Sequence, residues 1–400
     1  MEQKQNLSLK NQNNCKNNDK KETENKETDL KKQGSKKMKG ILTLTIITQR
    51  ANSLNYGESI GNVSILKKVS LGDGSQITYI SDKALKYDIK RKGKEEKEWK
   101  LLDEKVKEIL AGSLTEMIQE KKRKESSEKK VLVLDVDNFV KELIKEYHEF
   151  DLFGGLFTNL KGANNEEVKL SYGDSVKRTT PVKVTYAYSI SKFRGDMDFM
   201  NNIDAYDRYI KHLERKEKQS IPQSEQHYAY YHYTLTVDLD RIGVWEGEKQ
   251  IEDVLSPEEK ASRVKDLLDV VMTLSRQIRG RYENLSPIFV IGGIYKVKNP
   301  FFMGSIDARE VEDGKLLLNI DRLLDCKNLI PEAERENTLC GMLTGFFVNE
   351  QEIREKLNCK KVEEVFDELK KKVNEVYGVS ETCGVSESVA NCSCNSKTVE

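Results

Sequence analysis

Residues 42–62, LTLTIITQRANSLNYGESIGN, decide the fold, and their character changes halfway along the stretch. The first half consists mainly of leucine and β-branched residues, which favour a buried strand. The second half is rich in Asn, Ser and Gly, with Arg50 at the junction. We therefore predict a first core strand over residues 40–48, followed by a long polar loop.

Further strands and helices are predicted downstream of this strand. Residues 63–69 and 76–80 form a hairpin around LGDG, and Ser81 caps a short helix over residues 82–91. Strand patterns recur at residues 131–136, 181–190, 228–240 and 288–297, and helical patterns at 137–150, 257–282 and 362–377. Strands and helices in this irregular order predict an α+β sheet domain with large insertions.

Composition narrows the class of protein. The chain has 400 residues, with 67 Lys plus Arg and 67 Asp plus Glu, so net charge alone predicts no polyanionic partner. No apolar run reaches the length of a membrane span, and the first residues are polar throughout. Seven scattered cysteines fit a reducing cytoplasm better than a disulfide framework.

Two polar tails and two insertions complete the predicted organisation. Residues 1–37 carry almost no apolar side chains, so we expect disorder there and ordered structure from Met38. Residues 378–400 form a second flexible tail. Residues 92–130 are predicted as a highly charged helical insertion, and residues 191–226 as a polar segment without a place in the core.

Catalytic signatures are missing from the sequence: it contains no GxxxxGK[ST], strand-borne GxGxxG, HExxH or GxSxG. His227 and His232 point to opposite faces of a predicted strand, which favours packing over metal binding. Cys392 and Cys394 are too closely spaced for a metal knuckle. We predict no metal ion and no other cofactor.

Asp238 and Asp240 leave one enzymatic alternative open. Two residues apart on a strand, they face the same way, as the metal-binding carboxylates of polymerase palms do. The simpler interpretation is that these carboxylates bond the next turn or a nearby cation. A metal-dependent nuclease using Asp238 and Asp240 therefore stays as the alternative function.

Basic and short polar side chains recur near the predicted strand ends. Such donors suit contacts with sugar and phosphate, and an aromatic ring between cations can stack on a base. The residues predicted to bind RNA are Arg50, Asn52, Ser53, Asn55, Lys67, Lys68, Arg91, Lys177, Arg178, Thr179, Phe193 and Arg194.

Several of these motifs, in this order, resemble one known family. The opening LTIITQRANSLNYGESIGN, then ITYISDKALKYDIKR, DLFGGLF, KRTTPVKVTYAYSI and YTLTVDLDRIG are similar to the Cas-seven superfamily. More narrowly they resemble its DevR/Cst branch, the backbone subunit of type I-B CRISPR Cascade complexes. The resemblance runs from about residue 38 to 243, more loosely to about residue 377, and leaves out both tails.

The resemblance implies an RRM-like (ferredoxin-like) palm carrying a finger at residues 92–130 and a thumb or web at residues 191–226. It implies that copies assemble along a CRISPR guide RNA, which pairs with target DNA, while the protein binds the RNA backbone without cutting it. The implied partners are further copies, the large subunit, the guide 5′-end-capping subunit and the guide-processing endonuclease. The historical name of the branch also leaves open a transcriptional autoregulator.

Overall fold

The computed structural model describes residues 38–103, 129–161, 168–199, 223–247 and 250–380, together with residues 106, 109, 112 and 114–119. The chain divides into two units, Met1–Lys39 and Gly40–Glu400, and the described helices and strands lie in the second. The predicted tail over residues 1–37, and residues 381–400 of the other tail, lie outside the described residues. No helix among the described residues combines the length and apolarity needed to cross a membrane.

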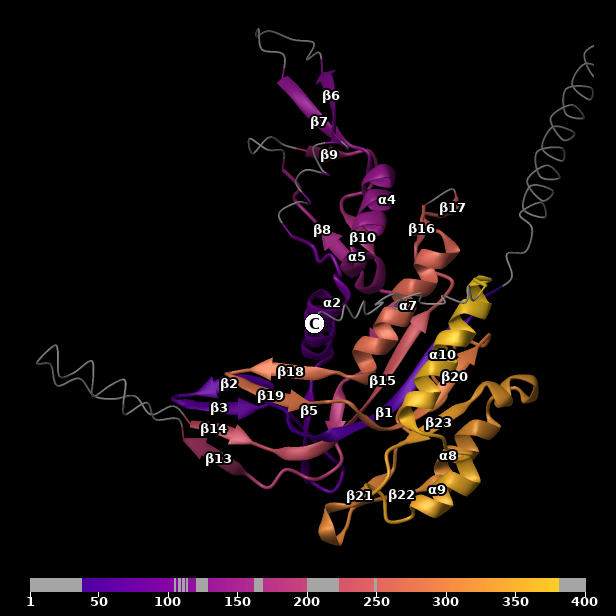
Figure 1. Cartoon of the computed structure of the whole chain (residues 1–400). Helices are drawn as coiled ribbons and strands as arrows, with labels where there is room; N and C mark the ends of the chain where they lie inside the picture. Colours follow the sequence, from indigo (N-terminus) through magenta and orange to yellow (C-terminus); the bar gives the residue numbers. More distant parts are fainter. Residues whose placement is uncertain are drawn as a thin grey trace, which may run out of the picture. The chain divides into compact units, whose positions relative to one another are not determined.

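An antiparallel sheet forms the centre of this unit (Figure 1). Its middle strand is β1 (Ile41–Asn52), which lies between β15 (Tyr228–Asp238) and β20 (Pro287–Tyr295). Across the sheet the order is β23-β20-β1-β15-β12-β5-β4, and β11 also pairs with β15. The outer strands are β4 (Lys68–Ser70), β5 (Gln76–Ile80), β11 (Val182–Val184), β12 (Ala187–Ser189) and β23 (Leu339–Met342). The combination of this sheet with packed helices confirms the predicted α+β class.

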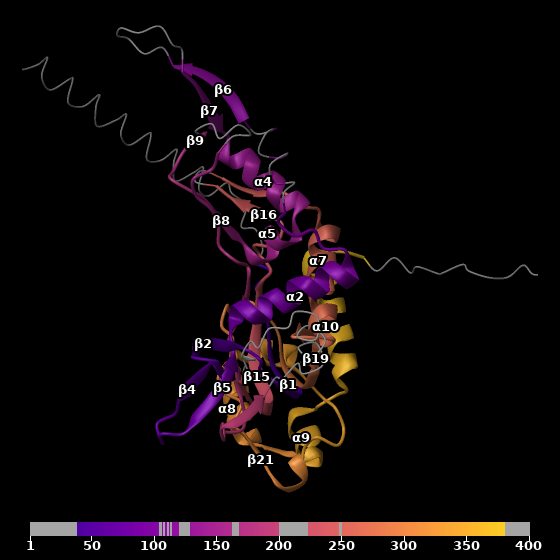
Figure 2. The same cartoon turned by 90° about the vertical axis from the view of Figure 1, so that its left-hand side faces the viewer.

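Three helices cover one face of the central sheet, which we call the helix face. They are α2 (Asp82–Lys97), α7 (Pro257–Met272) and α10 (Val362–Tyr377), and α7 and α10 lie side by side (Figures 1 and 2). Leu42, Leu44 and Ile46 of β1 belong to the same buried cluster as Leu267 and Leu369 of these helices. The opposite face buries Ile41 and Ile47, so β1 is apolar on both sides, which accounts for its continuous run of leucine and β-branched residues.

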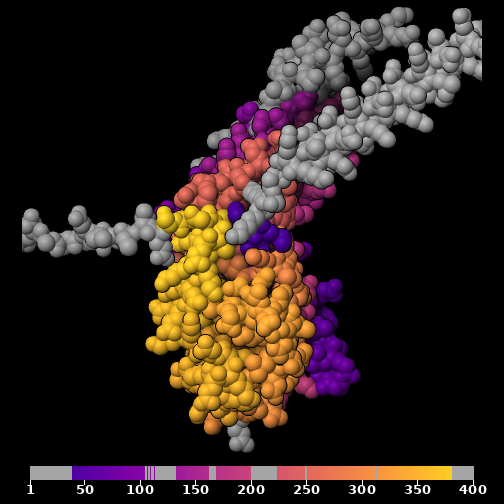
Figure 3. Space-filling model, turned by 90° about the vertical axis from the view of Figure 1, so that its right-hand side faces the viewer, coloured from indigo at the N-terminus to yellow at the C-terminus, as the bar shows by residue number. Residues whose placement is uncertain are grey.

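The C-terminal part of the chain covers the opposite face over β20 and β23. Its elements are β21 (Ala308–Glu310), η1 (Glu312–Gly314), β22 (Leu316–Leu318), α8 (Ile320–Asn328), η2 (Glu332–Asn337) and α9 (Glu350–Leu357). Phe301, Phe302 and Leu323 pack there against Phe289 and Ile291 of β20. Figure 3 shows the orange-to-yellow part of the chain as a continuous surface. No helix or strand is predicted from the sequence over residues 298–361.

Smaller sheets surround the central one. One has the order β13-β14-β3-β2 and another the order β6-β7-β9, and the pairs are β8 with β10, β16 with β17, and β18 with β19. Their bounds are β2 (Tyr56–Ile60), β3 (Val63–Leu66), β6 (Leu114–Gln119), β7 (Lys129–Leu134), β8 (Gly155–Phe157), β9 (Val168–Leu170), β10 (Val176–Arg178), β13 (Asp196–Phe199), β14 (Gln223–Gln226), β16 (Val244–Glu246), β17 (Ile251–Asp253), β18 (Ser275–Ile278) and β19 (Arg281–Asn284). Helices α4 (Val136–Glu146) and α5 (His148–Phe153) share a buried cluster with Trp245.

A β-bulge in β1 changes which face its side chains occupy. Along β15 the register passes from Ile47↔His232 to Arg50↔Tyr230, so three steps on β1 oppose two on β15. Before the bulge, Leu42, Leu44 and Ile46 lie on the helix face, and after it Ala51 joins the same cluster. Arg50, which a regular strand would direct into that core, lies instead beside Tyr230 on the opposite face.

Several predicted elements are confirmed. Strands β15 and β20 and the hairpin of β4 with β5 form where the alternation and LGDG place them. The last helix has the predicted bounds, residues 362–377. The Ser81 side chain accepts a hydrogen bond from the backbone N–H of Ala84, as expected of an N-cap.

Other predictions are wrong. The polar loop after residue 48 is ordered strand, because β1 continues to Asn52 and β2 follows. The insertion at residues 92–130 is not a single helix, since α2 ends at Lys97 and β6 and β7 pair farther along. The helix predicted to end at residue 282 stops at Met272, and the hairpin of β18 with β19 follows it. The helix predicted to begin at residue 137 begins at Val136, with Asp135 as its N-cap. The segment predicted as strand over residues 181–190 contains two short strands, β11 and β12.

Gly292 in β20 marks the closest approach between β20 and β1. Its φ is +155°, and a Cβ there would lie 1.9 Å from the Thr43 carbonyl oxygen. We expect Gly292→Ala to lower the free energy of unfolding by about 3 kcal/mol, because β1 or β20 must shift. Gly72→Ala, with nothing within 4 Å of the added Cβ, is the control and should change stability by less than about 0.5 kcal/mol. Urea unfolding measures both variants, and equal stabilities would contradict this packing.

Candidate nucleic-acid interface

The side chains predicted to bind RNA lie in four parts of the unit. Arg50, Asn52, Ser53 and Asn55 lie at the end of β1. Lys67 and Lys68 connect to this group, because the Lys67 N–H donates to the Asn55 carbonyl oxygen at 2.9 Å. The remaining residues lie on α2 (Arg91), on and after β10 (Lys177, Arg178, Thr179), and before β13 (Phe193, Arg194).

Arg50 is held by protein groups but stays reachable. Its side chain is 28% exposed, pairs with Glu310 and donates to the Gly314 carbonyl oxygen at 3.0 Å. Its guanidinium lies over the Tyr230 ring, 4.8 Å from the ring centroid. An anionic ligand at Arg50 therefore competes with the carboxylate of Glu310.

The three polar residues after Arg50 bind other parts of the protein. Asn52 donates from its backbone N–H and its side-chain amide to the Glu283 carboxylate, at 2.9 and 3.2 Å. Ser53 is fully buried, and its carbonyl oxygen accepts from Arg276. The Asn55 side-chain oxygen accepts from the Ser81 backbone N–H at 3.0 Å. These contacts stabilise the end of β1, and RNA contact by these residues stays a prediction.

Lys68 and Phe193 come together although they are far apart in sequence. The Lys68 ammonium lies 4.4 Å from the Phe193 ring centroid and 2.7 Å from a carboxylate oxygen of Glu225. The edge of the same ring meets His227 at 5.6 Å between centroids. An aromatic ring thus lies beside a cation next to β14, and this cation is Lys68 rather than a sequence neighbour of Phe193.

Lys67 and Arg194 differ from Lys68 in having no anionic partner in the part of the chain that the structure describes. Lys67 is partly buried and Arg194 is exposed. Among the residues that the structure describes, neither side chain forms an ion pair or a hydrogen bond. Their charges are therefore available to a ligand without breaking a protein contact.

Arg178 has a structural environment. It is 8% exposed and donates to the Asp151 carboxylate at 2.8 Å, to the Val244 carbonyl at 2.6 Å and to the Arg241 carbonyl at 2.8 Å. Asp151, fully buried on α5, also accepts from Arg263 of α7 at 2.9 Å. Burial lowers the pKa of Arg178, an effect that the Asp151 carboxylate opposes. These contacts occupy the guanidinium donors of Arg178. The predicted contact of Arg178 with RNA would therefore require its side chain to leave these partners.

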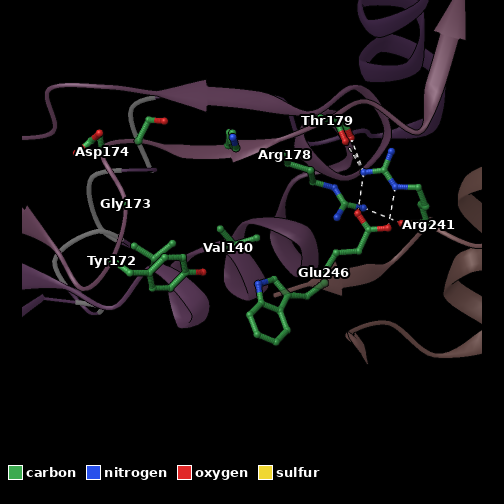
Figure 4. A pocket seen from close by; sticks show the side chains of 12 residues that line it. Val140, Tyr172, Gly173, Asp174, Arg178, Thr179, Arg241 and Glu246 are labelled. Carbon is green, nitrogen blue, oxygen red and sulfur yellow. Dashed lines mark hydrogen bonds and ion pairs between the residues drawn. The ribbon is translucent and has the colours of Figure 1, made fainter. Parts of the chain in front are cut away.

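A pocket of about 480 Å³ lies beside Arg178 (Figure 4). The exposed side chain of Lys177 lines it, together with Tyr172 and Asp174. At its other end Arg241 donates to the Thr179 hydroxyl at 2.5 Å and pairs with Glu246 at 2.9 Å. Lys177 has no ion pair among the described residues, whereas Thr179 is an acceptor for Arg241.

Arg91 lies on α2 and is mostly covered. Its guanidinium pairs with Glu95 at 2.6 Å and donates to the Ser275 carbonyl at 2.8 Å. The contact with Ser275 links α2 to β18. Arg91 therefore differs from Lys67, Lys177 and Arg194, which form no ion pair among the described residues.

Asp238 and Asp240 share one cation. The Lys298 ammonium lies 2.7 Å from an Asp238 oxygen and 2.9 Å from an Asp240 oxygen. These hydrogen bonds outweigh burial and raise the pKa of Lys298. The simpler interpretation from the sequence, a nearby cation bound by both carboxylates, matches this arrangement. Among the described residues no group of three His, Cys, Asp or Glu side chains could hold a metal ion.

Comparison with known protein families decides the family. Residues 42–312 match the family described as CRISPR-associated negative auto-regulator DevR/Csa2, which is more than half of the chain. The chain belongs to the DevR/Csa2 family. The predicted resemblance to the DevR branch is thereby confirmed. In this DevR/Csa2 chain the matched residues run from β1 into η1 and leave out α8, α9 and α10. No curated protein matches the chain.

Two solved structures align with most of this DevR/Csa2 chain. A chain of "CRISPR RNA-guided surveillance complex, pre-nicking" aligns with a TM-score of 0.50 and 14% sequence identity, covering 83% of this chain and 100% of that chain. A chain of "CRISPR RNA-guided surveillance complex" aligns with a TM-score of 0.42 and 11% identity, covering 84% of this chain and 98% of that chain. The first alignment shows a common fold.

We expect the stability of this DevR/Csa2 chain to depend on pH, because two of its histidines have lowered pKa values. Burial lowers the pKa of His232 on β15 to about 4, and burial also lowers the pKa of His148 on α5 to about 4. Both values lie below the unfolded value of about 6.5, so stability is complete above that pH and is lost as pH falls toward 4. We expect the unfolding free energy to fall by up to about 2–3 kcal/mol per histidine by pH 4.5.

Urea unfolding of the wild type and His232→Gln across this pH range measures the contribution of His232. The variant lacks the titrating imidazole, so its stability should fall less steeply between pH 6.5 and 4.5. Parallel curves for the two proteins would contradict the assignment to His232.

Proposed function

We propose that this DevR/Csa2 protein is a noncatalytic, guide-RNA-binding backbone subunit of a type I-B CRISPR Cascade surveillance complex. Copies assemble along the spacer of the guide RNA in the cytoplasm and present it for pairing with target DNA in antiviral defence. Family membership over residues 42–312 carries the proposal. Further partners are the large subunit, the guide 5′-end-capping subunit and the guide-processing endonuclease.

The order of the central strands supports an RRM-like (ferredoxin-like) palm. In sequence the elements run β1, α2, β12, β15, α7 and β20, and in space the strands lie in the order β20-β1-β15-β12. Two strand–helix–strand units interleaved in one antiparallel sheet correspond to the split βαβ arrangement. The finger corresponds to residues 92–130, and the thumb to residues 191–226, of which the described ends form the antiparallel pair β13 and β14.

Three exposed or partly exposed cations are the best candidates for contacts with the RNA backbone. They are Lys67, Lys177 and Arg194, which have no ion pair among the described residues. Cations of this kind position an RNA without reading its sequence. Phe193 beside Lys68 adds a ring for a base at the foot of the thumb. Arg50 can join after releasing Glu310.

The contacts of Asp238 and Asp240 support a protein that binds RNA without cutting it. Asp238 and Asp240 already neutralise Lys298, and a metal ion would have to displace that ammonium. Incubation of the purified protein with labelled RNA and Mg²⁺ or Mn²⁺ tests the nuclease alternative. Cleavage that Asp238→Ala abolishes while RNA binding persists would replace the proposed function.

Co-expression of the full chain with guide RNA and its partner subunits tests the main proposal. RNA of uniform length should co-purify with a higher-order assembly, and binding should weaken steeply with salt. A monomer free of nucleic acid under these conditions would contradict it. Binding to the chain's own promoter DNA without guide RNA would favour the autoregulator that the family description names.

A further inference from the structure

Three tyrosines that are not among the residues predicted to bind RNA lie together near the β4 edge of the central sheet. We call Tyr79, Tyr186 and Tyr188 the tyrosine cluster. The rings of Tyr79 and Tyr186 stack at 5.0 Å between centroids and 10° between planes, and Tyr188 lies 6.0 and 6.1 Å from them. Neighbours Ile80 and Ala187 point into the helix-face core, so the tyrosines lie on the opposite face of β5 and β12.

The C-terminal elements leave this part of the opposite face accessible. Tyr186 is 42% exposed, although large aromatic side chains are usually well buried. Tyr188 lies in one row of paired residues with His232 of β15, Ile47 of β1 and Phe289 of β20. Ile47 and Phe289 in that row are fully buried beneath the C-terminal elements. This face of the sheet is therefore buried over β1 and β20. Over β5 and β12 it presents aromatic side chains that a ligand can reach.

A pocket of about 470 Å³ adjoins the tyrosine cluster. Tyr186 and Tyr188 contribute aromatic walls, and His232 contributes an imidazole that can form a hydrogen bond, whereas the Thr185 and Thr234 hydroxyls already bond other protein groups. Met303 and Gly304 border it from the C-terminal part of the chain. Flat rings combined with a few polar atoms are what a planar, hydrogen-bonding ligand requires.

A free cation lies on the same face. Lys183 of β11 is exposed between the buried Val182 and Val184, and it forms no ion pair among the described residues. Along the chain Lys183 is three residues before Tyr186. A ring and an ammonium on one face, three residues apart along the chain, suit a nucleotide, which has a planar base on one side and a phosphate on the other.

We propose that the tyrosine cluster and its pocket bind one unpaired base of a single-stranded nucleic acid, with the base stacked on Tyr186. Lys183 contacts the neighbouring phosphate, and polar groups of the pocket meet the edge of the base. This site adjoins Lys67 of the predicted strand-end contacts, because the Tyr79 backbone N–H donates to the Lys67 carbonyl oxygen at 3.0 Å, and it adds a base-stacking contact to their backbone contacts. It rests on the proposed function, because the ligand is the single-stranded RNA that the protein binds.

Tyr186→Leu tests the stacking, because it keeps an apolar side chain and removes the ring. The probe is a short single-stranded RNA containing a fluorescent purine analogue, titrated into the full-length protein at several salt concentrations. We expect about tenfold weaker binding and loss of the fluorescence quenching that stacking causes, with an unchanged salt dependence. Lys183→Ala should lower the slope of log affinity against log salt by about 0.7, because one phosphate contact is lost.

The control is Tyr87→Leu, since Tyr87 is exposed on α2, outside the cluster. It should leave affinity and quenching unchanged. If the wild type binds the RNA and Tyr186→Leu binds and quenches equally, the stacking site is wrong while the proposed function stands. If Tyr186→Leu instead weakens self-association at full RNA affinity, the cluster is a protein contact and the inference is overturned. Failure of the wild type to bind RNA overturns both.

Discussion

Asp151→Ala is expected to lower the free energy of unfolding by about 3–5 kcal/mol, the largest effect of a single carboxylate that we predict. The substitution leaves Arg178 and Arg263 buried without their common anion, 2.8 and 2.9 Å from its oxygens. It also removes the acceptor for the Gly243 backbone N–H at 2.9 Å. These partners come from β10, α7 and the turn after β15, so their contacts with α5 weaken together.

Urea unfolding of the full chain, followed by circular dichroism, measures this loss. Asp174→Ala is the matched control, because Asp174 is exposed and lines the pocket beside Arg178. It should change stability by less than about 0.5 kcal/mol. A loss below about 1 kcal/mol for Asp151→Ala would mean that the two arginines find other acceptors, and the assigned role of Asp151 would be wrong.

Simultaneous replacement of Lys67, Lys177 and Arg194 by alanine should weaken binding to guide RNA by about 100-fold at physiological salt. These side chains have no ion pair among the described residues, so their removal costs the fold little. The slope of log affinity against log salt should fall by about 2, because three phosphate contacts to a single strand are lost. Fluorescence anisotropy with a labelled single-stranded RNA measures both quantities.

Lys94, Lys145 and Lys371 provide a control triple. They are exposed lysines on α2, α4 and α10, and their replacement removes the same formal charge. If both triples weaken RNA binding equally, the protein attracts RNA through overall charge and the strand-end cations have no special part. Unchanged binding by the first triple alone would exclude these cations as the interface.

Local patterns predicted the long, regular elements of the fold. Alternation predicted β15, continuous apolarity predicted β1 and β20, and an amphipathic pattern predicted α10. The extension of β1 beyond Thr48 was missed because Arg50 and Asn52 are polar, and their partners Glu310 and Glu283 are far away in sequence. No local pattern reveals such tertiary contacts.

The candidate site was harder to predict for the same reason. Arg178 has the sequence pattern of a ligand-binding residue, yet Asp151 and Arg263 make it part of a buried charge cluster. Whether a cation is free or paired depends on long-range contacts, so KRTT alone cannot distinguish Lys177 from Arg178. The tyrosine cluster did have a signal in TYAYS, where aromatic residues alternate on a strand next to a lysine.

The bulge in β1 holds two residues, Thr48 and Gln49, between Ile47 and Arg50, where a regular strand has one. Because the bulge takes up the extra residue, Arg50 lies on the same face as Tyr230 and the tyrosine cluster. Deletion of one of them would leave two steps on β1 opposite two on β15, so the bulge would be lost while Arg50 stayed opposite Tyr230 on the face of Ile47. Among relatives of this chain, a stretch shorter by one residue should therefore go with a regular β1 that still carries its arginine opposite this tyrosine.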